Sequence, residues 1–208
     1  MKILIVTATD AEFAPLQVPG HDIDRLVTGV GMAATAARCS KALSGGEYGL
    51  ALNFGVCGTF DSELIPGRVV HVVADRFAEL GAEDGDAFLT LNELGLPGDD
   101  EFINVRPPAN AALDRLTAVR GITVSTVHGN ASSIAAVRRR FDPQVESMEG
   151  AAFMYSCLLC DVPFAQVRAV SNVVEPRNRA AWKMNEAIAA LADAARDILN
   201  SPRSRSRV

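Results

Sequence analysis

Long apolar runs, a surplus of positive charge and a secretion signal are all missing from this sequence. None of its apolar stretches reaches the roughly 18 residues that a membrane-spanning helix needs. Asp10 and Glu12 interrupt the N-terminal run, which lacks the basic-then-apolar pattern of a signal peptide. The chain carries 20 Lys and Arg against 25 Asp and Glu, whereas a nucleic-acid-binding surface needs basic side chains to replace the counterions of phosphates. We therefore expect a cytoplasmic protein that binds neither membranes nor nucleic acids.

Few residues in this sequence are suited to metal or redox chemistry. The four cysteines lie in apolar stretches and are expected to be reduced, buried thiols: Cys39, Cys57, Cys157 and Cys160. The last two form a C-x-x-C motif, but this motif lies in a helical pattern and lacks both a second ligand pair and a strand-to-helix entry. The three histidines are far apart, with no partner at the spacing of metal ligands: His21, His71 and His128. We therefore predict no metal and no cofactor.

Apolar runs and helical patterns alternate along the chain. Short apolar runs typical of buried strands occupy residues 2–7, 25–28, 50–55, 67–74, 121–127 and 163–171. Helical patterns begin at Asp10, which is placed to cap its helix, and continue over residues 32–44, 109–119, 132–140, 149–160 and 178–199. This alternation predicts an α/β fold, a three-layer α/β/α sandwich around a central mixed sheet.

The chain shows no internal repeat and no linker. We predict a single domain over residues 1–200, followed by a polar and disordered tail at 201–208. The pattern weakens over residues 75–108, where Gly, Asp and Glu are frequent. Because this segment is long for a structureless loop, we expect it to cover a site or an interface.

Two glycine clusters mark places where the backbone can approach a ligand closely. Gly29-x-Gly31-x-x-Ala34 matches a loose dinucleotide-binding pattern. It does not follow the first strand, however, and no acidic residue stands at the end of a second strand, which disfavours a nicotinamide oxidoreductase. The second cluster, NFGVCG at 53–58, ends a predicted strand and indicates either a ligand crevice or only a tight turn.

Three polar side chains are expected at strand ends or helix starts. Glu149 stands at the start of an apolar helix, where a carboxylate is favourable, and Asn172 ends an apolar strand. Each alone is explained as a helix-start acid or a turn asparagine. Together with Glu12 they indicate a ligand site, because such sites form at the strand ends of α/β sheets.

The order of these segments resembles the purine nucleoside phosphorylase/hydrolase superfamily over nearly the whole chain. The resemblance is carried by KILIVTATDAEF, TGVGMAATAA, NFGVCG, VESMEGAAF and VRAVSNVVE, and is similar to the methylthioadenosine/S-adenosylhomocysteine nucleosidase branch. Ser147-Met148-Glu149-Gly150, Ser171-Asn172 and EPRNRAAW (175–182) resemble the futalosine hydrolases in particular. The resemblance implies hydrolysis of the N-ribosidic bond of futalosine in menaquinone biosynthesis, a purine nucleoside as the small-molecule partner, and a homodimer or higher homo-oligomer.

The resemblance also implies roles for single residues. Glu12 matches the carboxylate that orients and deprotonates the attacking water, and Glu149 the carboxylate that binds the ribose hydroxyls. Met148 is expected to pack on the sugar, and Asn172 to meet the base. Further substrate contacts are expected from four residues: Gly55, Val56, Ser171 and His128. His128 follows a predicted strand and is placed either in the base pocket or in a surface turn.

One departure from the nucleosidase pattern bears on the substrate. Asn172 stands where adenine-directed enzymes carry a proton-donating aspartate, and an amide both donates and accepts hydrogen bonds but supplies no proton. This favours a hypoxanthine-type base, with aminodeoxyfutalosine and methylthioadenosine as alternative substrates. The segment Asn53–Val56 has no cation and no hydroxyl to hold phosphate, which favours water as the nucleophile. A nucleoside-binding protein without catalysis is the alternative of a different class, and the presence of both acids argues against it.

Overall fold

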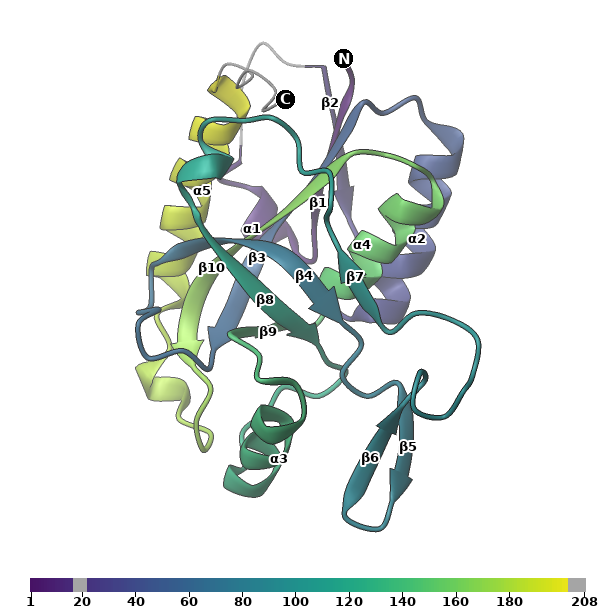
Figure 1. The fold of residues 1–208 in the computed structure, drawn as a ribbon. Helices are drawn as coiled ribbons and strands as arrows, with labels where there is room; N and C mark the ends of the chain where they lie inside the picture. The colour runs from purple at the N-terminus through teal and green to yellow at the C-terminus, as the bar shows by residue number, and fades with distance from the viewer. Residues whose placement is uncertain (17–21, 202–208) are drawn as a thin grey trace.

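The computed structural model describes residues 1–16 and 22–201, and it confirms the predicted α/β architecture. Helices cover both faces of one mixed sheet (Figure 1). His21 and residues 202–208 of the predicted tail lie outside the described residues.

Four parallel strands form one half of the sheet, in the order β2 (Ile23–Val27), β1 (Ile3–Thr7), β3 (Leu50–Thr59) and β10 (Phe164–Val173). The crossover from β2 to β3 contains the helix α2 (Met32–Gly45), as the connection between parallel strands of one sheet commonly does. β1 is buried along its whole length and β10 over all but its last two residues, as expected for strands that are covered on both faces. Their carboxyl ends meet at one edge of the sheet.

The other half of the sheet closes into a ring. β4 (Val69–Arg76) runs antiparallel to β10 and parallel to β8 (Thr117–Thr123), and β9 (Val145–Ser147) joins β8 to β3. Because β3 also pairs with β10, five strands form a closed barrel. A closed barrel has no unpaired strand edges. Its interior holds polar side chains, as the site below shows.

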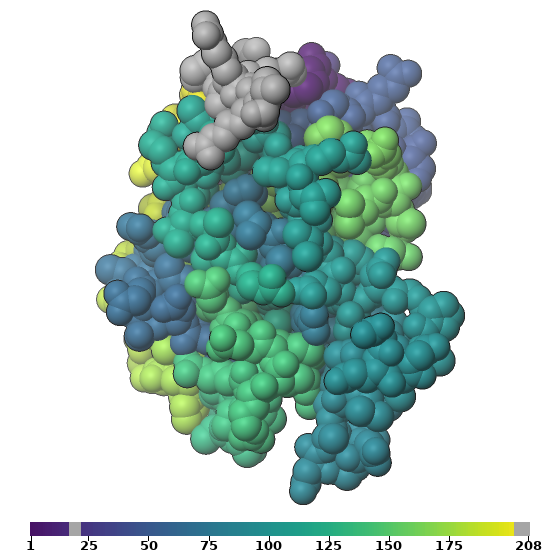
Figure 2. All heavy atoms as spheres, viewed as in Figure 1, coloured from purple at the N-terminus to yellow at the C-terminus, as the bar shows by residue number. Residues whose placement is uncertain are grey.

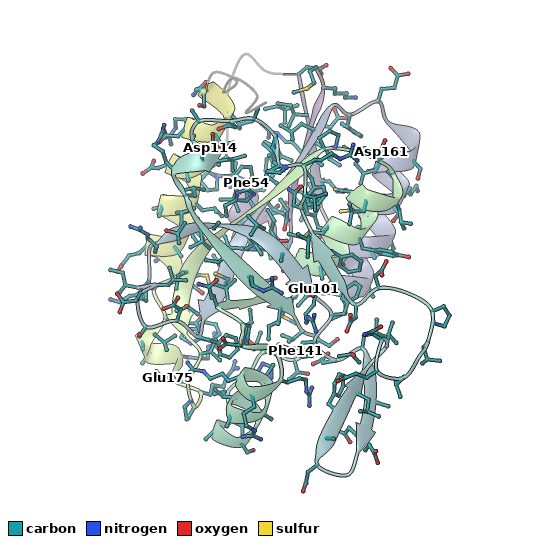
Figure 3. All side chains as sticks on the ribbon, in the orientation of Figure 1. Phe54, Glu101, Asp114, Phe141, Asp161 and Glu175 are labelled. Carbon is teal, nitrogen blue, oxygen red and sulfur yellow. The ribbon has the colours of Figure 1, made fainter. Side chains whose placement is uncertain are left out.

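Two apolar cores separate the layers. The helices α2 (Met32–Gly45) and α4 (Gly150–Leu159) pack on one face, where Phe153 is fully buried. The long helix α5 (Met184–Asn200) packs on the other, against Phe54 (labelled in Figure 3). The buried residues of α5 recur at helical spacing and form one apolar stripe: Ala187, Leu191, Ala195 and Ile198. No helix within residues 1–16 and 22–201 is long and apolar enough to cross a membrane.

Several predicted boundaries are wrong. The helix expected at 109–119 is a single 3₁₀ turn at Leu113–Arg115, and β8 begins two residues later, ahead of the strand expected at 121–127. The strand expected at 50–55 continues through the second glycine cluster to Thr59, because its glycines pair with β10. The last helix begins at Met184 instead of residue 178, after a 3₁₀ turn at Arg179–Ala181. The sequence pattern did not indicate the three-residue strand β9.

The segment 75–108 has its own secondary structure. β5 (Gly81–Asp84) and β6 (Ala87–Thr90) form a hairpin that stands out from the body of the protein (Figures 1 and 2). β7 (Glu101–Ile103) returns to the sheet beside β4. Aromatic and cationic contacts hold the hairpin against α3 (Ala131–Phe141): the ring of Phe88 lies 6.2 Å from that of Phe141 (labelled in Figure 3) and 3.8 Å from the Arg140 guanidinium.

Candidate active site

A pocket of about 330 Å³ lies where β1 and β10 end. Seven of the eight residues that the sequence singled out line it: Glu12, Val56, His128, Met148, Glu149, Ser171 and Asn172. Gly55 does not line the pocket and lies behind it, against a buried arginine. Trp182, Met184 and Ile188 form an apolar wall from the segment that leads into α5. The pocket therefore combines carboxylates and an amide with apolar surface, as small-molecule sites do.

Glu12 is held in place by the start of the short helix α1 (Asp10–Phe13). Thr9, and not Asp10 as expected, caps this helix, and the Glu12 Oε2 atom accepts hydrogen bonds from the Thr9 N–H and hydroxyl at 2.9 Å each. The Oε1 atom accepts from the Val56 N–H at 3.2 Å. Such a capping box satisfies helix-end donors and the carboxylate at once. Glu12 therefore enters the pocket buried and with a fixed orientation.

Glu149 is placed by the junction between β9 and α4. Its Oε1 atom accepts a hydrogen bond from the Gly31 N–H at 3.1 Å. Gly31 has a φ of +99°, a backbone conformation that favours glycine. The first glycine cluster thus provides a backbone N–H donor for a carboxylate of the pocket. This role differs from the binding of a dinucleotide phosphate.

The first residue of α4 fixes how closely this helix approaches the barrel. A Cβ atom on Gly150 would lie 2.1 Å from Asp75 Oδ2 and 2.3 Å from Gln166 Nε2, too close for any larger residue. Asp75 is fully buried and accepts hydrogen bonds from Gln166 at 2.9 Å and from the Thr123 hydroxyl at 3.0 Å. Burial raises the pKa of its carboxyl group from 3.8 to about 6, and these hydrogen bonds oppose the shift.

Arg168 is a site residue that the sequence analysis missed. It projects from β10 into the barrel, is 1% exposed, and donates through Nη2 to Asn53 Oδ1 at 2.7 Å. Its Nη1 atom lies 3.9 Å from Glu149 Oε2. The same Nη1 atom lies 2.0 Å from the position that a Cβ atom on Gly55 would take. This Cβ position is in turn 3.3 Å from Glu12 Oε1. The segment Asn53–Val56 carries no cation of its own, but a neighbouring strand places one beside it.

Asn172 and Ser171 end β10 beside the pocket. The Ser171 Oγ atom lies 2.8 Å from Asn172 Oδ1, to which it donates, and 3.1 Å from the Cys57 carbonyl oxygen. Asn172 Nδ2 donates to the Val173 carbonyl at 3.0 Å. An amide NH₂ has two hydrogens, so one donor of Asn172 remains for a ligand.

His128 lines the pocket from the loop between β8 and α3, and does not end a strand as expected. Its Nδ1 atom lies 2.6 Å from Glu146 Oε2, and its backbone N–H donates to Glu146 Oε1 at 3.1 Å. The ring also contacts Phe60 edge to face, with 6.2 Å between the ring centroids. Glu146, which lines the pocket from β9, is a second residue that the sequence analysis missed.

The cysteines are free thiols, as predicted, and all but the half-buried Cys160 are buried. Burial raises the pKa of the pocket residue Cys57 to about 12 and that of Cys157 well above its ordinary value. A thiol with so high a pKa is not a nucleophile at neutral pH. Neither Cys57 nor Cys157 thus provides an activated thiolate.

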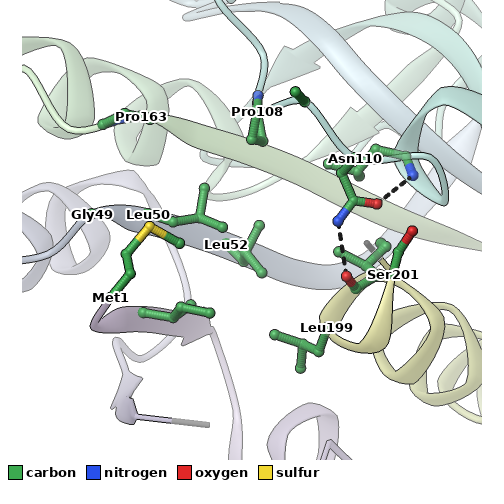
Figure 4. Close-up of a pocket in the computed structure, with 13 residues that line it drawn as sticks. Met1, Gly49, Leu50, Leu52, Pro108, Asn110, Pro163, Leu199 and Ser201 are labelled. Atoms are coloured by element: carbon green, nitrogen blue, oxygen red, sulfur yellow. Dashed lines mark hydrogen bonds between the residues drawn. The ribbon is translucent and has the colours of Figure 1, made fainter. Parts of the chain in front are cut away.

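A larger cavity of about 560 Å³ lies at the opposite ends of the strands (Figure 4). It is lined mainly by apolar side chains such as Leu50, Leu52 and Leu199, and the Asn110 amide is turned to the Ile198 carbonyl at 2.8 Å. Among residues 1–16 and 22–201, its lining includes no carboxylate, imidazole or guanidinium side chain. The chemistry therefore belongs to the smaller pocket.

Comparison with known proteins agrees with this arrangement of fold and pocket. A family model described as the phosphorylase superfamily matches residues 16–200, and the chain belongs to this superfamily. Futalosine hydrolase of Streptomyces coelicolor is 36% identical over 93% of both chains, and that of Thermus thermophilus is 33% identical over 84% of this chain and 80% of its own. Within the superfamily, the chain belongs to the futalosine hydrolase family.

Solved structures share the fold at low sequence identity. The 5′-methylthioadenosine/S-adenosylhomocysteine nucleosidase of Neisseria meningitidis, in complex with methylthio-immucillin-A, superimposes with a TM-score of 0.78 at 15% identity, covering 95% of this chain and 98% of its own. A futalosine hydrolase mutant of Helicobacter pylori gives a TM-score of 0.77 at 12% identity, covering 96% and 98%. The resemblance inferred from the sequence is thereby confirmed.

Proposed function

We propose that this protein hydrolyses the N-ribosidic bond of futalosine, releasing hypoxanthine and dehypoxanthine futalosine in menaquinone biosynthesis. Membership of the futalosine hydrolase family supports the substrate. The observation that carries the reaction type is the placement of two buried carboxylates, Glu12 and Glu149, in one pocket, with the Arg168 guanidinium behind them.

Breaking the bond between sugar and base develops positive charge on the ribose and negative charge on the departing base. Catalysis must stabilise both charges and deliver water to the anomeric carbon. In the proposed mechanism Glu12 takes a proton from the water as its oxygen bonds to this carbon, and the electron pair of the broken bond leaves with the base. Glu149 holds the ribose hydroxyls near the developing cation, and Met148 packs on the sugar.

Arg168 gives this mechanism a physical basis. Its guanidinium lies behind the pocket, close to both acids, and a positive charge there reduces the repulsion between two neighbouring carboxylates. The same arrangement disfavours phosphate as the nucleophile, because the guanidinium already faces Glu149 and the two acids would repel an anion. Water, which is neutral, meets no such penalty.

The proposed base is hypoxanthine, and it rests on Asn172. The amide has one donor free for N7 or O6 of the base and supplies no proton to the leaving group. A 6-oxopurine spreads the leaving-group charge onto O6, which reduces the need for protonation at N7. Adenine nucleosides, the substrates in the names of several structural neighbours, need that proton more, so aminodeoxyfutalosine and methylthioadenosine are weaker candidates.

We also propose that the protein acts in the cytoplasm as a homo-oligomer. Four free thiols suit a reducing compartment. Large apolar side chains are exposed on α4 and beside β7, as on surfaces that pair with another subunit: Tyr155, Leu158, Leu159, Ile103 and Val105. Light scattering on the purified protein measures the mass of the assembly.

Product analysis tests the proposed reaction. Purified protein is incubated with futalosine, aminodeoxyfutalosine, inosine and methylthioadenosine, each with and without phosphate. We expect hypoxanthine and a free reducing sugar from futalosine at a rate independent of phosphate. A ribose 1-phosphate product would overturn the hydrolase assignment, and binding without cleavage of any of the four would favour a nucleoside-binding protein.

A further inference from the structure

The strand register places a carboxylate and an amide on either side of Gly58 in the pocket floor. Gly58 of β3 pairs with Asn172 of β10 on one side and with Glu146 of β9 on the other. A Cβ atom on Gly58 would lie 2.8 Å from Val174 Cγ2, 3.3 Å from Asn172 Nδ2 and 3.6 Å from Glu146 Cγ. The two polar side chains therefore lie on the same face of the sheet, beside the Val174 side chain, and both line the pocket.

Glu146 is a buried acid of this pocket floor, and His128 holds both of its carboxylate oxygens. The residue is 4% exposed, and each of its carboxylate oxygens has a hydrogen-bond partner in His128, the backbone N–H on Oε1 and the imidazole Nδ1 on Oε2. Because a carboxylate oxygen has two lone pairs, each oxygen can still accept one more hydrogen bond. A buried acceptor that lines a ligand pocket and keeps unused lone pairs selects ligands that donate a hydrogen bond.

We propose that Glu146 is the residue that selects a 6-oxopurine, by accepting a hydrogen bond from the N1–H of the base. This inference rests on the proposed function only in taking a purine base as the group that fills the pocket. Hypoxanthine has a hydrogen on N1, whereas N1 of adenine is itself an acceptor. The carboxylate matches the first and opposes the second, because two acceptors that face each other in a buried site leave both unpaired.

Glu146 reads a different edge of the base from Asn172. The Asn172 amide is placed for N7 or O6, where it can donate a hydrogen bond. A carboxylate accepts only, so Glu146 distinguishes the N1–H of hypoxanthine from the N1 acceptor of adenine. His128 is in this proposal a positioning residue, which fixes the carboxylate by two hydrogen bonds and does not itself meet the base.

Binding of free bases tests this proposal without requiring turnover. Trp182, the single tryptophan, lines the pocket, so its fluorescence reports binding of hypoxanthine and adenine. We expect wild type to bind hypoxanthine more tightly than adenine, and Glu146→Gln to lower this preference by about tenfold to a hundredfold. The amide keeps an acceptor for the His128 N–H and offers a donor to N1 of adenine. Glu63→Gln, the same change at an exposed position outside the pocket, should leave the preference unchanged.

Variants of His128 cover the case in which Glu146→Gln does not fold. His128→Leu removes the ring donor and should lower the preference for hypoxanthine, while His128→Asn keeps a donor at that position and should restore most of it. A preference that stays the same in Glu146→Gln or His128→Leu, with both bases still bound, overturns the proposal. A variant that loses affinity for adenine instead of hypoxanthine also overturns it, since the carboxylate would then face the exocyclic amino group of adenine.

The same experiment separates this proposal from the proposed function. If neither base binds to wild type, both fail. If wild type prefers hypoxanthine and Glu146→Gln removes the preference, the proposed role of Glu146 is supported even where futalosine is not cleaved. If futalosine is cleaved and the preference does not depend on Glu146, the proposed function is supported and another residue selects the base.

Discussion

Arg168 fills the space that a side chain at Gly55 would occupy. Its Nη1 atom lies 2.0 Å from the position of a Gly55 Cβ and, on its other side, 3.9 Å from Glu149 Oε2. Gly55 is therefore a glycine for a reason other than backbone conformation: its missing side chain lets the guanidinium reach the two acids.

The first prediction follows from this contact. Gly55→Ala should push the guanidinium away from Glu12 and Glu149 and lower kcat/KM about a hundredfold, because small misplacements of catalytic groups have effects of this size. The melting temperature should change little, since the displaced atom is the end of a flexible side chain. Gly45→Ala, at the end of α2 where a Cβ meets nothing within 4 Å, should change neither quantity. Normal turnover in Gly55→Ala would show that the position of Arg168 does not matter.

Glu12→Gln should abolish turnover and leave nucleoside binding largely intact, because it removes a general base and keeps its shape. Loss of a positioned base commonly lowers the rate by about 10²–10⁴-fold. Turnover and Trp182 fluorescence titration with the nucleoside measure the two effects separately, with Glu63→Gln as the matched exposed change. Near-normal turnover would show that Glu12 is not the general base and that it only caps α1 through its contacts with Thr9.

The sequence predicted the layers and most of the pocket, because these depend on local patterns. Continuous apolar strands, the helix stripe of α5 and polar residues at strand ends are all visible in the order of residues. The closure of the barrel was not predictable, because it depends on which strands pair and not on what any strand contains. β9 has three residues, too few to show an alternating pattern, and it carries Glu146.

Arg168 was missed although the sequence contains a signal for it. It is the one cation within the apolar run PFAQVRAVS, and a charged residue in a buried strand needs a partner. Its partners are Asn53 of β3, which is 115 residues away in sequence, and Glu149 at the start of α4. A single sequence shows that such a partner is needed but not which residue it is. The predicted helix at 109–119 failed because the apolar residues after 116 instead pair with β4 as β8.

Asp75 should make the stability of the protein depend on pH. Its pKa is raised from 3.8 to about 6 in the folded state, mainly by burial, so the folded protein binds a proton more readily than the unfolded chain between these values. The free energy of unfolding should therefore fall as the pH rises from 4 to 6 and change no further above that. At 1.36 kcal/mol per pKa unit the loss is about 3 kcal/mol.

Asp75→Asn removes this titration and should keep the buried contacts. The amide oxygen still accepts from Thr123, and its NH₂ can donate to Gln166 Oε1, a buried atom without a hydrogen-bond partner among the described residues. Urea unfolding at pH 4 and pH 7 measures the difference in stability between wild type and variant. This difference should shift by about 3 kcal/mol in favour of the variant at pH 7, whereas Asp86→Asn, exposed beside the turn of the hairpin, should show no such shift. An unchanged difference would mean that Asp75 is ionised throughout.

The last prediction concerns the proton that an adenine leaving group needs. If the Asn172 amide meets the base, futalosine should exceed aminodeoxyfutalosine in kcat/KM by about tenfold to a hundredfold, since one unpaired buried polar group costs about 1–3 kcal/mol. Asn172→Asp should shift the ratio toward the adenine nucleoside, because a protonated carboxyl group can supply the N7 proton. The Val173 carbonyl, which accepts from the Asn172 amide, can accept from a protonated carboxyl group but would face an ionised one, and this contact favours the protonated form.

The shift should be strongest at acidic pH, where the introduced carboxyl group is more often protonated. The measurement is the ratio of the two kcat/KM values for wild type and variant between pH 5 and pH 8. Asn178→Asp, the same change at an exposed position outside the pocket, is the matched control and should leave the ratio as in wild type. Glu146→Gln should also change the ratio, but by the same factor at every pH. It alters the contact with N1 of the base and supplies no proton to N7. A ratio that does not move in Asn172→Asp at any pH would remove Asn172 from the reading of the base and leave that role to Glu146.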